Sequence, residues 1–170
     1  TFPNARYFVQ KDALDDALNP SERSKSLYRD DDYQPLLDAG QLDVVDGPME
    51  IAQGVWVEPA TGPTPGHQIV VAEGPDETYA FLGTLVPTSM HLTPEVVAAA
   101  DWNPEATCRA KQSVRQHAVK ESWNVAPVGR DEWVCAGDLD ALAAFSLGET
   151  LPKAPVAKGR TVKEPLPVAV

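Results

Sequence analysis

Histidine and cysteine are the side chains of this sequence best suited to binding metals or attacking substrates. Its 3 histidines are His67, His91 and His117, and no two of them lie two or four positions apart. Zinc sites draw on closely spaced His and Cys ligands, so this spacing predicts structural or solvated histidines. Cys108 and Cys135 either form one disulfide or remain buried thiols, and so few cysteines favour a reducing compartment, the cytoplasm or the interior of an organelle.

Common catalytic motifs are absent from the sequence, which has no G-x-S-x-G elbow, P-loop or G-x-G-x-x-G run. Ser89 and His91 are alternate residues of an expected extended segment, so their side chains would point to opposite faces. Cys108 and His117 lie on an expected helix, about 13.5 Å apart along its axis. The sequence therefore predicts no catalytic residue.

Two segments have more distinctive amino-acid sequences. Ala60–Gln68 reads A-T-G-P-T-P-G-H-Q, and Phe81–Pro87 reads F-L-G-T-L-V-P. The apolar runs at 55–58, 68–72 and 78–82 predict three strands, joined first by the Gly/Pro-rich loop and then by a hairpin turn.

These segments resemble the T-G-H-T-P-G-H and F-L-G-D-L-V-P motifs of metallo-β-lactamase-fold hydrolases. The resemblance places Pro63 where the family has a metal-binding His, and Thr84 where it has the carboxylate that bridges two metals. The family's last metal-binding His falls near Arg130, which is followed by the matching Asp131. His67 matches the second His of the family loop, which is not a ligand there, and we expect it to hold the loop through hydrogen bonds.

The residues at these positions are unsuited to a dimetal site. Such a site needs several nitrogen and oxygen donors at about 2 Å from the ions. Pro63 offers no side-chain donor, Thr84 offers a neutral hydroxyl, and Arg130 is a permanent cation that repels metals. The family's first metal motif, H-x-H-x-D-H, does not occur in the sequence. We therefore expect a vestigial active site without metal or another cofactor.

The resemblance also implies a fold. It runs from about residue 1 to residue 136 and matches the later part of an αββα sandwich. The expected class is α/β, a layered arrangement in which helices cover a mixed sheet. We expect a degenerate metallo-β-lactamase-like domain over 1–149 and an extended Pro/Lys-rich tail over 150–170.

Periodicity and capping signals place the individual elements. Strands are expected at 5–10, 42–45, 49–51, 55–58, 68–72, 78–82, 123–128 and 133–136. Helices are expected at 11–18, 19–28, 30–37, 94–100, 103–122 and 139–145.

Charge divides the chain into two parts. Residues 1–149 hold 10 Lys/Arg and 24 Asp/Glu, a net charge of −14. The tail carries +3, from four basic residues and Glu164. The basic tail residues, which we treat as a possible partner-binding segment, are Lys153, Lys158, Arg160 and Lys163. The acidic body argues against nucleic-acid binding through phosphates and favours a soluble protein.

Three functions fit these observations. The first is a non-catalytic structural or assembly subunit, because a partial sandwich leaves an apolar sheet face that a protein partner or a homo-oligomer mate would cover. The second is part of a hydrolase that another chain completes. The third is a small-molecule binding module that uses the vestigial cleft. No apolar run is long enough to span a bilayer and no signal-peptide segment is evident. A first residue of Thr1 indicates processing or a longer product.

Overall fold

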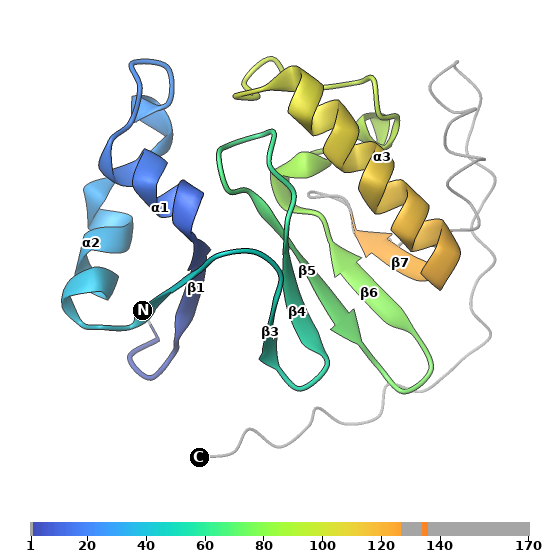
Figure 1. Ribbon diagram of the computed structural model, residues 1–170, viewed down its shortest axis with the longest axis horizontal. Helices are drawn as coiled ribbons and strands as arrows, with labels where there is room; N and C mark the ends of the chain where they lie inside the picture. Colours follow the sequence, from blue (N-terminus) through green and yellow to red (C-terminus); the bar gives the residue numbers. More distant parts are fainter. Residues whose placement is uncertain (1, 127–133, 136–170) are drawn as a thin grey trace.

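The computed structural model describes residues 2–126 and 134–135 (Figure 1). The strands are β1 (Tyr7–Gln10), β2 (Leu42–Val45), β3 (Met49–Ala52), β4 (Val55–Pro59), β5 (Gln68–Glu73), β6 (Thr78–Phe81), β7 (Trp123–Ala126) and β8 (Val134–Cys135). The α-helices are α1 (Lys11–Leu18), α2 (Asp30–Asp38) and α3 (Pro104–Glu121), and short 3-10 helices are η1 (Lys25–Leu27), η2 (Gly83–Leu85) and η3 (Ser89–Leu92). The helix expected at 139–145, the tail and the domain boundary at 149 lie outside the described residues.

A six-stranded sheet forms the centre of the structure, in the order β3-β4-β5-β6-β7-β8. Its neighbours are antiparallel except β6 and β7, which run parallel. The parallel pair requires a crossover, and the chain makes it through α3, which packs against β7. The sheet is therefore mixed, as expected from the sequence.

The sequence around residue 103 explains where α3 begins. The Asn103 side chain accepts a hydrogen bond from the Ala106 backbone N–H at 3.0 Å, and Pro104 occupies the first helical turn. Both features favour a helix start at this position. The Asn103 side chain binds a backbone N–H that would otherwise be unpaired, and proline has no backbone N–H that needs a partner. The helix ends at Glu121, and the next residue, Ser122, caps it with a left-handed φ of 55°.

The hydrophobic core lies between α3 and one face of the large sheet. Val71, Ala80 and Val125 are paired neighbours across β5, β6 and β7, so they share a face. All three are buried together with Ala118 of α3. Burying this apolar area supplies the main force that holds the helix on the sheet.

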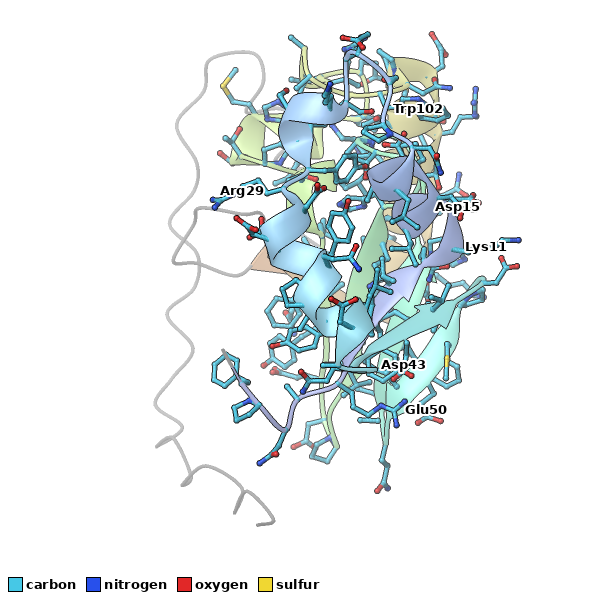
Figure 2. The ribbon with its side chains drawn as sticks, turned by 90° about the vertical axis from the view of Figure 1, so that its left-hand side faces the viewer. Lys11, Asp15, Arg29, Asp43, Glu50 and Trp102 are labelled. Atoms are coloured by element: carbon cyan, nitrogen blue, oxygen red, sulfur yellow. The ribbon has the colours of Figure 1, made fainter. Side chains whose placement is uncertain are left out.

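The opposite face of the large sheet receives a second, smaller sheet. β1 and β2 pair in parallel, and α1 and α2 pack on them. Two glutamines join the sheets: the Gln10 amide donates to the Gln68 Oε1 at 3.2 Å, and the Gln68 amide donates to the Phe8 carbonyl at 3.1 Å. The layers are therefore helices, small sheet, large sheet and helix (Figure 1). Figure 2 views the molecule from the side of α1 and α2, which lie in front of the sheets.

Residues 19–28 do not form the predicted helix. They form turns followed by the 3-10 helix η1. The Ser21 and Ser24 hydroxyls each accept a hydrogen bond from the other residue's backbone N–H, at 3.1 and 3.0 Å. Such side-chain bonds give the backbone an alternative to helical pairing, which is why the capping signal at Asn19 is not followed by a helix.

Residues 94–100 are also not helical, contrary to expectation. Their carbonyl groups bond to cationic side chains instead: Lys111 Nζ donates to Val96 at 2.5 Å, and Arg23 donates to Ala99 at 2.9 Å. On α3, Ala110, Val114 and Ala118 pack against the hydrophobic core. Ala118 is fully buried, and the buried residues of this helix also include Lys111.

Candidate functional site

The loop between β4 and β5 is closed by its own backbone. The Ala60 N–H donates to the His67 carbonyl at 2.6 Å, and the His67 N–H donates to the Thr64 carbonyl at 3.3 Å. A further bond joins the Gly62 N–H to the same Thr64 carbonyl at 3.3 Å. The loop is thus a preformed turn whose shape does not depend on a ligand.

Two glycines allow this loop to touch α1 and α3 at once. A Cβ atom on Gly62 would lie 2.4 Å from the Thr107 backbone nitrogen in α3. One on Gly66 would lie 2.4 Å from the Ala13 backbone nitrogen in α1. Contacts this short are not possible for a side chain, so both glycines are required by packing. The loop therefore connects the helices on both sides of the molecule.

Two backbone bonds fix the loop to the start of α3. The Trp102 N–H donates to the Pro63 carbonyl at 2.9 Å, and the Asn103 N–H donates to the Gly62 carbonyl at 3.0 Å. Pro63, at the position of a metal-binding His in the resemblance, is buried. Its visible role is therefore to anchor the segment that caps α3.

His67 links the loop to the second distinctive segment. Its Nε2 is 3.0 Å from where a Cβ atom of Gly83 would lie. Its Nδ1 is buried and has no hydrogen-bond partner among the described residues. His67 contacts the loop through both parts of the residue: its backbone makes the loop hydrogen bonds, and its ring interacts with the Ala60 backbone and lies against Gly83.

Burial also sets the charge state of His67. Desolvation lowers the pKa of its imidazole, and the Ala60 backbone and the Asp101 carboxylate act more weakly in the opposite direction. Burial penalises the charged form of a base. The neutral ring is therefore the form that the fold favours.

This pKa direction predicts an acid-sensitive stability. Because the pKa is lowered, the unfolded chain binds a proton more readily than the folded chain. Stability should therefore fall as the pH drops from about 6.5 towards the folded-state pKa, and this group should contribute no pH dependence above about 6.5. We expect His67→Gln to lose less stability than the wild type between about pH 7.5 and about pH 5 in urea unfolding.

His117→Gln is the control for this measurement, since His117 is an exposed histidine and its loss should leave the acid sensitivity in place. An acid sensitivity in His67→Gln equal to that of the wild type would contradict the assignment.

The positions that a dimetal site would use do not fit one. Thr84 is exposed in η2, and Pro63 has no side-chain donor. Arg130 and Asp131 lie outside the described residues. Within residues 2–126 and 134–135, no three His, Cys, Asp or Glu side chains gather closely enough to hold a metal ion. We therefore derive no step through a metal at this site.

His91, His117 and Cys108 lie outside the two distinctive segments. The His91 Nδ1 and the Thr88 hydroxyl are 2.8 Å apart, and partial burial lowers the pKa of His91. The ring of His117 stacks on Trp123 with centroids 6.2 Å apart. Cys108 is a partly buried free thiol in the structure.

Sequence analysis missed a buried polar group beside the loop. Asp101 is 5% exposed and Lys111 is 4% exposed. Their charges act on each other, since Asp101 raises the pKa of Lys111 against the larger, lowering effect of burial. Arg23 donates to the Asp101 backbone carbonyl at 2.9 Å. Lys111 lies four residues after Thr107, which is also buried, and this helical spacing was the available signal.

Among the residues that the structure describes, no helix is both long and apolar enough to cross a membrane.

Comparison with solved structures identifies the fold. No family model and no curated protein matches the sequence. A probable metal-dependent hydrolase from Staphylococcus aureus is similar in structure, with a TM-score of 0.68 and 24% identity, covering 79% of this chain and 53% of that chain. An N-acyl homoserine lactone hydrolase with its product at the catalytic metal centre has a TM-score of 0.62 and 20% identity, covering 78% of this chain and 54% of that one.

A third similar structure is hydrolase AbOPH of the β-lactamase superfamily, with a TM-score of 0.63 and 19% identity, over 78% of this chain and 55% of that chain. This chain thus spans about half the length of the structures that it matches. The layers, the sheet order and these similarities together show that the chain has part of the metallo-β-lactamase fold.

Proposed function

We propose that this chain is a non-catalytic subunit that acts through protein contacts and uses a metallo-β-lactamase fold as a scaffold. The observation that carries the proposal is a contrast within the two distinctive segments. Residues that the packing needs are present, and residues that would bind metals in the resembling family are replaced.

The packing residues are Gly62, Gly66 and Gly83, each of which meets another part of the chain closely, together with His67. The replaced positions are different. A buried proline and an exposed threonine stand where the family's His and bridging carboxylate would be. Selection for the fold alone explains this contrast, because packing keeps the glycines whether or not a metal binds.

The second face of the large sheet supports protein contacts. Val57, Val70 and Phe81 are paired across β4, β5 and β6 and share this face. Met49 of the edge strand β3 pairs with Val57 and extends this apolar row of side chains. Val57 is buried, whereas Met49 is 43% and Phe81 is 47% exposed. The small sheet therefore covers only part of an apolar face, and exposed apolar surface of this kind is typical of a protein interface.

Native mass spectrometry of the full chain, purified from its source without chelator, tests this proposal. We expect a defined assembly heavier than the 18.3 kDa chain. Met49→Lys should weaken the assembly about tenfold or more, because a lysine would be desolvated in an apolar contact. Val119→Lys is the matched control, since Val119 is 52% exposed on α3 and should leave the assembly intact.

A chain that remains monomeric at all accessible concentrations would overturn the proposal. An assembly equally stable in Met49→Lys and the wild type would show that the sheet face is not the contact.

A further inference from the structure

A groove lies on the other side of the large sheet, between α3 and strands β4 and β5. It encloses about 350 Å³, a volume within the range of small-molecule sites. Its floor is apolar and includes Ala60, Ile69 and Val114. Ile69 is 1% exposed and Ala60 is 3% exposed, so both residues belong to the packed core.

Three polar side chains from two different elements line this groove. Glu58 is paired with Ile69 across β4 and β5, which places its side chain on the α3 side of the sheet. Ser113 and His117 lie four residues apart on α3 and face the groove together. The His117 ring is stacked on Trp123 at an interplanar angle of 27°, which restricts where the imidazole can move.

The arrangement favours binding over catalysis. A serine nucleophile needs a hydrogen bond to its base, and the base needs one to an orienting acid. Among the described residues, no hydrogen bond joins Ser113, His117 and Glu58. The Ser113, His117 and Glu58 side chains instead lie around an apolar floor without bonding to one another, so each can contact a different part of one ligand.

We propose that this groove binds a small organic ammonium ion with an apolar body. The Glu58 carboxylate has neither a hydrogen bond nor an ion pair within the described residues. It is half-buried, so a cationic partner there gains more than it would at a fully exposed site. The apolar floor accepts the body of the ligand, and the Ser113 hydroxyl and His117 imidazole accept or donate further hydrogen bonds.

The net charge agrees with a cationic ligand. Residues 1–149 carry −14, which raises the local concentration of small cations and disfavours anions. The groove lies on the face opposite the partly exposed apolar row, so a ligand here and a protein partner there would not compete. The inference therefore stands independently of the proposed assembly role.

Three probes of similar shape and different charge test the inference. Benzylamine is a cation at neutral pH, benzyl alcohol is neutral and phenylacetate is an anion. In ¹H–¹⁵N spectra of the full chain, benzylamine should shift the backbone signals of Glu58, Ile69 and Ser113. Benzyl alcohol should bind at least about tenfold more weakly, and phenylacetate should not bind, because only the ammonium ion gains a charge-assisted bond.

Glu58→Gln keeps the shape of the side chain and removes its charge, and should weaken benzylamine binding about tenfold. Glu73→Gln makes the same charge change at the far end of β5, where Glu73 is exposed, and should leave binding unchanged. Nα-acetyl-lysine methylamide separates two sources of the ammonium group. Binding equal to that of benzylamine identifies a protein lysine, and weaker binding identifies a free amine.

Equal affinity for benzylamine and benzyl alcohol would overturn the inference. So would shifts located away from the groove, or a Glu58→Gln protein that binds benzylamine as the wild type does.

Discussion

Replacing Gly66 with alanine is expected to lower the free energy of unfolding by about 3 kcal/mol or more. Two effects add at this position. Its φ of +63° is left-handed, which costs about 1–2 kcal/mol for a residue with a Cβ atom. The added methyl would also lie 2.4 Å from the Ala13 backbone nitrogen, and forcing apart such a packed contact costs about 1–3 kcal/mol more. Urea unfolding followed by circular dichroism measures the change.

Gly40→Ala separates these two effects. Gly40 has nearly the same φ, +64°, yet a Cβ atom there would meet nothing within 4 Å. We therefore expect Gly40→Ala to show only the backbone cost, about 1–2 kcal/mol. If Gly66→Ala were no more destabilising than Gly40→Ala, the loop would not be pressed against α1 as described.

Lys111→Met is expected to destabilise the fold by about 2 kcal/mol. Methionine keeps most of the apolar stem but removes the ammonium group that donates to the Val96 carbonyl at 2.5 Å. An acceptor left unpaired costs about 1–3 kcal/mol. The Asp101 carboxylate, in a residue only 5% exposed, would also lose a favourable charge. The change should appear as a lower urea midpoint with an unchanged slope.

Two further variants show whether Lys111 acts through this polar group. Lys120→Met removes an exposed lysine from the last turn of the same helix and should cost less than about 1 kcal/mol. Combining Lys111→Met with Asp101→Asn should cost less than the sum of the single changes, because the two charges act on each other. Strict additivity would contradict the coupling.

Local sequence signals predicted the regular elements well. The run from Lys11 to Leu18 forms the helix that its spacing indicates, and Asp30 begins α2 as an acidic first turn. The cap at Asn103 and the proline after it start α3. These signals are reliable because the interactions that start and stabilise each of these helices are made by residues that are close in the sequence.

The same local signals gave a wrong prediction where residues distant in the sequence interact. Residues 94–100 look helical in isolation, but Arg23 and Lys111 bind their carbonyl groups from other parts of the chain. Lys111 is buried as well: its amine donates to the Val96 carbonyl, and the Asp101 charge acts on it favourably. Sequence spacing cannot show which distant group will satisfy a buried charge.

The sequence indicated which positions of the family motif carry replaced residues, but it did not indicate how the motif segments pack. The resemblance located Pro63 and Thr84 as replaced ligand positions. It did not indicate that Gly62 and Gly66 bring the loop against α3 and α1, because a glycine's neighbours are absent from its own sequence. That packing role changes the interpretation of the motif: its glycines are evidence for the fold and not for metal chemistry.

The most direct test of the account is the metal content of the full chain. The purified protein would be incubated with excess zinc or iron, dialysed without chelator and measured by inductively coupled plasma mass spectrometry. A variant carrying Pro63→His and Thr84→Asp would be measured in parallel. The account predicts substoichiometric metal in the wild type, because Pro63 and Thr84 cannot supply the missing ligands. One or two tightly held ions per wild-type chain would contradict it and would make a hydrolase the leading interpretation.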